Sequence, residues 1–319
     1  MATIGLSATA VSHLRFAVSA LWEVLASVRL LLDPGVPAVH RRWADRARPG
    51  LDRDGLLRHL IAPSGGYTPD FVTPPPAGLD ADLGRELAGL RATPPGLVRA
   101  HLDLLPAARR AALHPLHDDP GAGLARLADE IAGYWAVAIA PDWPRMRALL
   151  DAEVQRRARR LAGGGSAAIL ADLHPRVRWR DGVLTVDQPH CAAPDVPAGA
   201  GLVLIPSVFV WPSVLTVTAG EVPQIAYPAR GVATLWERSS RSPDALAGVL
   251  GRGRALLLTS LITPLSTTEL ARRTGITAGG VSQHLAALRA AGLVVTHREG
   301  RSLVNVRTEV AEALLTAAG

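Results

Sequence analysis

The sequence predicts an α+β protein of two domains: a mostly helical N-terminal domain with a small antiparallel sheet, and a smaller C-terminal domain of helices and one hairpin. At 319 residues the chain is longer than most single domains. Its apolar residues follow helical spacing up to Gly163 and alternate in the stretch that follows. All aromatic residues lie at or before Trp236, and the polar stretch 237–243 comes next. We therefore expect the domains to be 1–240 and 244–319.

The first part of the N-terminal domain has the spacing of helices. From Phe16 to Leu32, apolar residues such as Leu21, Leu25 and Val28 recur on one helical face, and Asp33-Pro34-Gly35 ends the pattern. Further short helices are expected over 51–61, 79–91, 95–113, 121–139 and 143–162, separated by segments rich in proline and glycine.

Strands are expected in the second part of this domain. The glycine run 163–165 is interpreted as a hinge. After it, residues from Val177 to Val186 alternate around Asp181-Gly182, which favours a hairpin. Shorter strands are expected over 201–205, 215–218 and 224–227.

Composition excludes several classes of protein. Apolar residues make up 48% of the chain and charged residues 19%, which is typical of a folded domain. The net charge is +6 and every basic residue is arginine, a bias of composition that does not by itself predict an anionic partner. The single Cys191 excludes an internal disulfide, and no apolar run is long enough to span a membrane. With no secretory leader at its start, the chain is expected to be cytoplasmic.

The C-terminal domain begins with a long helix, expected over 244–262 and stopped by Pro264; its buried face is predicted to hold the apolar residues Leu246, Val249, Leu250, Leu257, Leu258 and Leu261. A second helix follows, for which Ser266 and Glu269 form a capping box and Gly275 is the expected end.

Thr277 can cap a third helix, which Gly292 ends. On it Val281, Leu285 and Leu288 share one face. The opposite face is small and polar, and consists of Ala278, Gly279, Ser282, Gln283 and Ala286. A helix that lies in the major groove of DNA needs such a face without bulky side chains.

The domain is expected to close with a hairpin and a helix. Residues 293–298 and 301–307 pair across Glu299-Gly300, and a last helix over Glu309–Ala318 is predicted to bury Val310, Leu314 and Leu315.

This order of helices and hairpin resembles the winged helix-turn-helix regulators of the ArsR type. The residues that carry the resemblance are Ser266–Ile276, Val281–Leu285 and Leu288–Val294. The resemblance implies a homodimer that binds a two-fold site on double-stranded DNA, usually as a repressor that a signal releases. It also implies that the helices over 246–262 and 309–318 form the dimer surface; the alternative is that their apolar faces pack within the chain.

The N-terminal domain is similar to an uncharacterised domain that precedes an ArsR-type domain in two-domain regulators of GC-rich bacteria. The Arg15-Phe16 and Trp22-Glu23 pairs and the stretch Val39–Trp43 carry this second resemblance. It implies no known chemistry, so this domain is expected either to sense an effector or to support the dimer.

Basic residues cluster by position in the C-terminal domain, which contains eight arginines and five acidic residues. Arg272 and Arg273 lie at the end of the second helix, and Arg298 and Arg301 flank the tip of the hairpin. In a winged helix bound to DNA, side chains at these two positions face the phosphates. Gln283 is suited to an adenine edge. The residues predicted to contact DNA are Arg272, Arg273, Thr277, Ala278, Gly279, Ser282, Gln283, His284, Arg289, Arg298 and Arg301. The alternative for each arginine is a solvated surface charge.

Catalytic and metal chemistry find no support in the sequence. Leu270, Ala271 and Arg272 stand where metal-sensing ArsR proteins carry a cysteine pair, and Cys191 alone cannot build a thiolate site. The stretch 114–119 has histidines at ligand-like spacing, but its prolines favour a loop, and His190-Cys191 lacks a third catalytic member. No phosphate loop or dinucleotide motif occurs. We expect no metal, no cofactor and no enzyme activity.

Aromatic residues are the remaining feature of the N-terminal domain. A pocket for an apolar small-molecule effector is predicted from Trp22, Trp43, Trp135, Trp143, Phe209 and Trp211. The alternative is that these side chains fill the core. Two other interpretations of the whole chain stay open: a ligand-independent DNA-binding protein whose N-terminal domain is a scaffold or binds a partner, and an enzyme with an accessory winged helix.

Overall fold

The structure, a computed structural model, describes residues 2–6, 8–63, 66–180, 182–187, 196–198, 201–217, 222–236, 243–261, 264–299 and 302–318. The chain divides into two compact units, Met1–Trp236 and Glu237–Gly319, here called the N-terminal and C-terminal units. In the described part of the chain, every helix is too short or too polar to span a bilayer.

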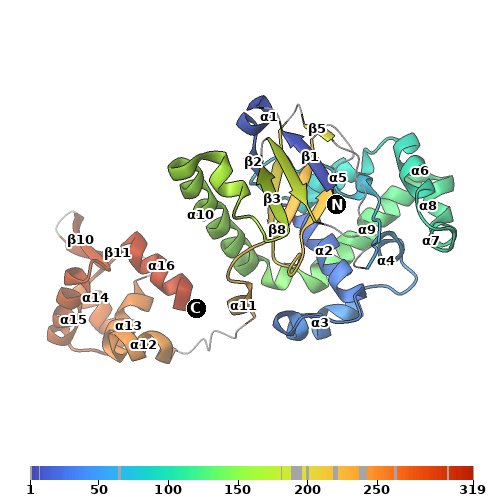
Figure 1. Ribbon diagram of the computed structural model, residues 1–319. Helices are drawn as coiled ribbons and strands as arrows, with labels where there is room; N and C mark the ends of the chain where they lie inside the picture. Colours follow the sequence, from blue (N-terminus) through green and yellow to red (C-terminus); the bar gives the residue numbers. More distant parts are fainter. Residues whose placement is uncertain are drawn as a thin grey trace. The chain divides into compact units, whose positions relative to one another are not determined.

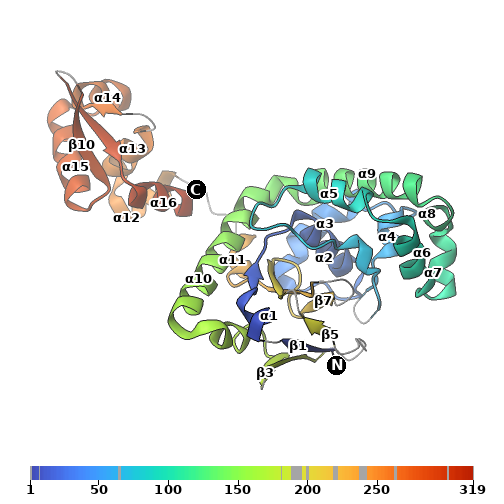
Figure 2. The same cartoon turned by 90° about the horizontal axis from the view of Figure 1, so that it is seen from above.

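The N-terminal unit surrounds its strands with helices: in Figures 1 and 2, α10 lies on one side of the strands and α6 to α8 on the other. The α-helices are α1 (Ala8–Ser12), α2 (Ala20–Leu32), α3 (Arg41–Ala47), α4 (Leu56–Leu60), α5 (Leu83–Arg91), α6 (Pro95–Asp103), α7 (Ala107–Ala112), α8 (His114–Asp118), α9 (Pro120–Ala138), α10 (Trp143–Leu170) and α11 (Val232–Leu235). Short 3-10 turns occupy η1 (Ala38–His40), η2 (Arg48–Gly50), η3 (Asp70–Val72) and η4 (Ala140–Asp142).

Two four-stranded sheets lie in this unit. The first has the order β3 (Val177–Arg180), β4 (Val183–Val186), β1 (Ala2–Leu6) and β5 (Val196–Ala198). The second has the order β2 (Arg15–Phe16), β6 (Val203–Ser207), β8 (Gln224–Pro228) and β7 (Leu215–Val217). The predicted α+β class is confirmed, and both sheets also contain parallel pairs, β1 with β5 in the first and β6 with β2 and β8 in the second.

Helix α2 crosses the core of the N-terminal unit. The Ser19 hydroxyl accepts from the Trp22 backbone N–H and caps the helix, while the Glu86 carboxylate accepts from the Ala20 and Leu21 N–H groups. The predicted start at Phe16 is therefore wrong. Phe16 belongs to β2, where it pairs with Leu204 of β6, because an edge of the second sheet takes up its backbone groups.

A buried carboxylic acid lies on α2. Glu23 is 1% exposed, and its side chain accepts from the Val208 backbone N–H at 2.9 Å. Burial raises the pKa of Glu23 to about 8, against the lowering effect of its hydrogen bonds. The side chain therefore keeps its proton in the folded state at neutral pH.

This shift predicts how stability depends on pH. Between the unfolded pKa near 4.5 and the folded pKa near 8, the folded state binds the extra proton, so the free energy of unfolding falls as pH rises through this window. Glu23→Gln cannot ionise, and its stability relative to the wild type is expected to rise by a few kcal/mol from pH 5 to pH 8. Urea unfolding followed by Trp fluorescence measures it, since every Trp lies in the N-terminal unit.

The exposed Asp45→Asn variant on α3 is the matched control and should track the wild type at every pH. Parallel curves for Glu23→Gln and the wild type would contradict an un-ionised Glu23.

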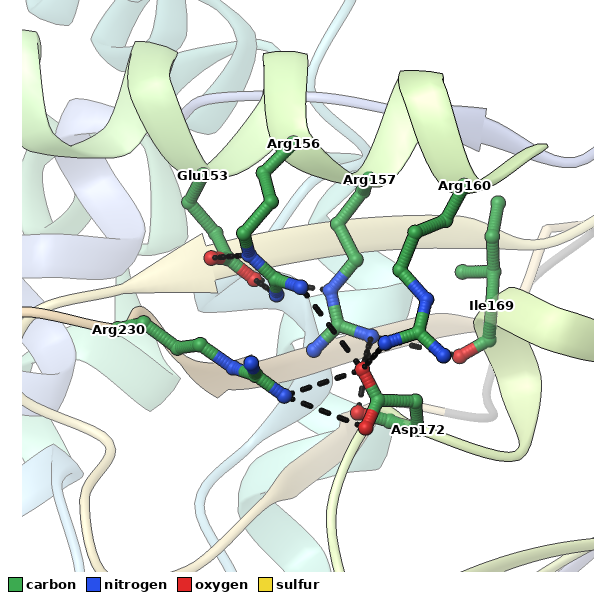
Figure 3. Close-up of polar contacts among 7 residues, drawn as sticks. All are labelled: Glu153, Arg156, Arg157, Arg160, Ile169, Asp172 and Arg230. Carbon is green, nitrogen blue, oxygen red and sulfur yellow. Dashed lines mark hydrogen bonds and ion pairs between the residues drawn. The ribbon is translucent and has the colours of Figure 1, made fainter. Parts of the chain in front are cut away.

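A kink and an arginine cluster shape α10. The helix changes direction at Gly165, whose φ of 69° is a left-handed value that favours glycine. The predicted hinge at 163–165 thus coincides with a break at Gly165 between the two helical arms of α10. Figure 3 shows four arginines around Asp172, just past the helix end, namely Arg156, Arg157, Arg160 and Arg230.

Arg157 joins the two arms of this kinked helix from within the core. It is 1% exposed, and its Nε donates to the equally buried Glu153 at 2.8 Å. Its Nη1 donates to the Asp172 backbone carbonyl at 2.9 Å. The guanidinium lies 5.2 Å from the ring centre of Tyr227 on β8, so one side chain ties the kinked helix to the second sheet.

Other helix predictions for this unit need correction. The stretch 114–119, predicted as a loop, contains α8, because Pro115 falls in the first helical turn, where its missing N–H leaves no bond unmade. The predicted helix over 95–113 is two helices, α6 and α7, with Pro106 as the N-cap of the second.

The C-terminal unit contains α12 (Pro243–Leu250), α13 (Arg252–Ser260), β9 (Leu265–Ser266), α14 (Thr267–Thr274), α15 (Ala278–Ala290), β10 (Val294–Glu299), β11 (Ser302–Arg307) and α16 (Glu309–Ala318). Its sheet has the order β10-β11-β9. The single helix predicted over 244–262 is wrong: Gly251, with a φ of 83°, separates α12 from α13. Val249 and Val310, both predicted to be buried, are 81% and 62% exposed.

Candidate nucleic-acid interface

Local capping positions the first motif helix, α14. The Ser266 hydroxyl accepts from the Glu269 backbone N–H, and Gly275 ends the helix in a left-handed conformation. Leu265 and Leu270, which flank the cap, are both buried in one core cluster, as in a hydrophobic staple. The start and end of this helix are therefore confirmed.

Helix α15 turns one face to the core and one to solvent. Thr277 caps it by accepting from the Gly280 N–H, and Val281, Leu285 and Leu288 are at most 2% exposed. The residues of the predicted small face are all exposed: Ala278, Gly279, Ser282, Gln283 and Ala286. We call Gly279, Ser282, Gln283 and Ala286 the outer face of α15. The largest side chain on this face is a glutamine, so a binding partner can approach close to the helix backbone.

His284 lies on the other side of α15. Its ring packs against Gly253 of α13, where an added Cβ would lie 2.5 Å from Nε2. Gly253 therefore allows the two helices to approach closely. Helical spacing puts the half-buried His284 beside the buried stripe, and its contact with DNA stays a prediction.

The hairpin is tied to α15 by side chains. Asn305 of β11, 2% exposed, donates to the Leu265 carbonyl at 3.1 Å and accepts from the Thr296 hydroxyl at 2.9 Å. The Thr296 hydroxyl in turn accepts from Arg289 of α15 at 3.1 Å. This chain of bonds fixes the angle between α15 and the hairpin, which Figure 2 shows side by side. The sequence pattern did not single out Asn305; a lone polar residue in an apolar strand was its only signal.

The predicted basic contacts occupy several settings. Arg272 and Arg273 at the end of α14 are exposed, and Arg272 lies 3.7 Å from Glu269. Arg298 near the end of β10 is exposed, and Arg289 is held by Thr296. Arg301 lies outside the described residues.

Arg307, which was not predicted to contact DNA, has a structural role. Its Nε donates to the Leu261 carbonyl at 2.6 Å and its Nη1 to Glu312 at 3.3 Å. It therefore joins β11 to the end of α13 and to α16.

The six aromatic residues predicted to line an effector pocket fall in three settings. Trp22 and Trp43 lie in the core, where their indole N–H groups donate to Gln224 and to the Ala138 carbonyl, and the Trp43 ring lies 4.3 Å from that of Phe209. Trp135 and Trp143 meet edge to face with ring centres 4.9 Å apart. Phe209 and Trp211 border a pocket, described below. A sequence count of aromatics cannot separate these settings, because all of them are apolar.

Within the described residues, no three His, Cys, Asp or Glu side chains are grouped as metal ligands would be. His190 and Cys191 lie outside the described residues. His114 and His117 pair with neighbouring acids: His114 lies 2.8 Å from Asp118, and His117 lies 3.3 Å from Asp103.

Comparison with known proteins identifies one segment. Residues 253–296, from α13 into the first strand of the hairpin, match the family described as "Bacterial regulatory protein, arsR family". No curated protein and no solved structure matches the chain. The C-terminal unit thus carries a helix-turn-helix domain of the arsR family, which supports a DNA-binding transcription regulator.

Proposed function

We propose that this chain, with its arsR-family domain as the DNA-binding part, acts as a homodimer on a two-fold DNA site and represses transcription until a non-metal small molecule releases it. The observation that carries the proposal is the outer face of α15. It is exposed and small, and a fully buried apolar stripe anchors the helix from behind. A helix built in this way suits insertion into the major groove.

Two observations support a dimer. One recognition helix contacts only a few base pairs, whereas two helices about 34 Å apart give usable specificity. The helices outside the motif also expose apolar side chains, with Val249 on α12, Leu256 on α13 and Val310 on α16 at 81%, 44% and 62% exposure. A second copy of the chain would cover them.

The residues on α14 support a signal other than a soft metal. Leu270 is buried, and Ala271 and Arg272 beside it offer no thiolate. The cytoplasmic location and the absence of enzyme activity expected from the sequence stay predictions.

Footprinting of the purified protein on its own promoter tests the proposal. We expect protection of two half-sites whose centres lie one helical turn, or a multiple of it, apart. Equal affinity for the promoter and for random DNA of the same length would contradict a sequence-specific regulator.

The hairpin arginines give a second test. Arg298→Ala combined with Arg301→Ala is expected to weaken binding to all sequences, because phosphate contacts carry no base information. The slope of log affinity against log salt should fall by about 1 to 2, since each lost phosphate contact releases roughly one counterion fewer. A gel-shift titration at several salt concentrations measures it.

The matched control is Arg41→Ala with Arg42→Ala, an exposed pair on α3 of the N-terminal unit, which should leave the slope unchanged. If the hairpin variant kept the wild-type slope, its arginines would not contact phosphates.

A ligand-independent regulator is the second candidate. The position of the aromatic residues favours it, because Trp22 and Trp43 fill the core and Trp135 packs edge to face on Trp143. In that case the N-terminal unit would serve as a scaffold, and no small molecule would change the affinity for the promoter.

A further inference from the structure

A pocket lies between α2 and the segment 209–215 of the N-terminal unit. Its apolar wall includes Leu30, Phe209, Val210 and Leu215. Trp211 also lines the pocket, and at 47% it is the most exposed aromatic side chain in the chain, all of whose aromatic residues are described. An exposed tryptophan beside apolar walls is typical of a surface that an apolar group covers.

One cation lines this pocket. Arg29 of α2 is half-buried, and none of the described residues forms a hydrogen bond with its guanidinium. Burial lowers the pKa of Arg29, and the charge of Asp33, one turn along the helix, counters that effect. A guanidinium stays charged even so, and it has donors in a planar fork that suits a carboxylate. Arg29 is therefore desolvated without the hydrogen bonds that usually accompany desolvation.

The geometry of the Arg29 guanidinium, rather than the balance of charge around it, favours a carboxylate. Asp33 also lines the pocket, and Arg109 adds a second positive charge that acts on Arg29. Attraction and repulsion both grow with the charge of an anion, whereas the planar fork of donors matches the two oxygens of a carboxylate. The pocket holds about 70 Å³, so its apolar wall favours a short hydrocarbon or aromatic body that remains partly outside it.

The pocket wall continues into the packing around the last residue of the unit. The ring of Phe209 lies 4.3 Å from that of Trp43 and 6.0 Å from that of Trp236. The Trp236 indole N–H donates to Nδ1 of the buried His40 at 3.1 Å. Trp236 is the last described residue before 237–242, the segment that leads to the C-terminal unit. A ligand that moves Phe209 therefore acts on the point where the chain leaves this unit.

We propose that this pocket is the effector site, and that it binds a small apolar monocarboxylate whose carboxylate pairs with Arg29 and whose body packs against Phe209 and Trp211. The proposal rests on the proposed function in one respect, that DNA binding responds to a small molecule. Binding at Arg29 itself does not depend on DNA.

Three monocarboxylates serve as probes on the full-length protein: phenylacetate, indole-3-acetate and hexanoate. Ligand-observed NMR measures their dissociation constants, and quenching of Trp fluorescence follows phenylacetate and hexanoate, which do not absorb with the indoles. We expect saturable binding of at least one probe. The neutral amide of that probe should bind at least tenfold more weakly, because it cannot pair with a guanidinium.

The variant Arg29→Met keeps the apolar stem and removes the charge, and it should weaken binding of the probe at least tenfold. Arg42→Met is the matched control, because Arg42 is an exposed arginine on α3 outside the pocket, and it should leave binding unchanged. No binding by any probe, equal binding of acid and amide, or equal binding to Arg29→Met and the wild type would each overturn the site.

A gel shift on the promoter DNA with saturating probe completes the test. We expect a loss of DNA affinity of at least fivefold in the wild type and none in Arg29→Met. Probe binding without any change in DNA affinity would overturn the effector role. A protein that binds the probe but shows no preference for its promoter would overturn the proposed function and leave the carboxylate site standing.

Discussion

Replacing Ala286 with glutamate is expected to reduce the affinity for promoter DNA by more than about a hundredfold, since like charges placed against each other across an interface cost several kcal/mol. Ala286 is the last residue of the outer face of α15 and is exposed. A glutamate there would bring bulk and negative charge to the surface that is proposed to enter the groove. A gel-shift titration measures the loss.

The same change at an unrelated exposed alanine provides the control. Ala132→Glu on α9 of the N-terminal unit should bind DNA as the wild type does. Both variants should keep the wild-type circular dichroism spectrum, because a glutamate is a good helix former at a solvent-facing position. Wild-type DNA affinity in a folded Ala286→Glu protein would mean that α15 is not the recognition helix.

Arg157→Met is expected to lower the free energy of unfolding of the N-terminal unit by about 1.5–3 kcal/mol. Methionine retains much of the apolar volume, but Glu153 loses its hydrogen bond from Arg157 at 2.8 Å and keeps only those from Arg156. The change also removes the donor to the Asp172 carbonyl, which holds the end of the kinked helix.

Urea unfolding followed by Trp fluorescence isolates this effect, because all seven Trp residues lie in the N-terminal unit. Arg159→Met, two residues along the same helix and exposed, is the control and should cost less than about 0.5 kcal/mol. The double variant Glu153→Gln with Arg157→Met should recover part of the loss. Equal stability of Arg157→Met and Arg159→Met would contradict a structural role for the buried pair.

The elements of the C-terminal unit were largely predictable because local signals determine them. Ser266, Gly275 and Thr277 cap helices through bonds to residues three or four positions away, so a short stretch of sequence contains the whole interaction. The exposed small face of α15 follows from helical spacing alone. The break at Gly251 was missed because apolar residues continue on both sides of it, and a glycine in a helical pattern does not reveal its φ.

The sheets of the N-terminal unit were only partly predictable, since distant segments form them. The hairpin β3–β4 has a local turn and was found. Strand β1, by contrast, pairs with β4, more than 170 residues later, and β2 pairs with β6 at a similar distance. Strands this short contain too few residues for an alternation of apolar and polar side chains to be recognised in the sequence.

The candidate sites divide in the same way. The outer face of α15 is a property of one helix, whereas the pocket at Arg29 requires α2 and the segment 209–215 to meet in space. Of the six aromatic residues singled out in the sequence, Phe209 and Trp211 line this pocket, and Trp43 packs behind Phe209. Nothing in the sequence distinguishes Arg29 from the other arginines. Its guanidinium lacks hydrogen-bond partners among the described residues only because of how the folded chain packs around it.

The hydrogen bonds from Arg289 through Thr296 and Asn305 to Leu265 connect α15, the hairpin β10–β11 and strand β9 into one rigid body. A rigid body keeps its internal geometry when the chain outside it moves. We expect a signal to control DNA binding by changing the distance or the angle between the two DNA-binding domains of a dimer. Each domain would stay unchanged, but the pair would no longer match the helical pitch of the duplex. The reading surface itself would stay the same with and without the signal.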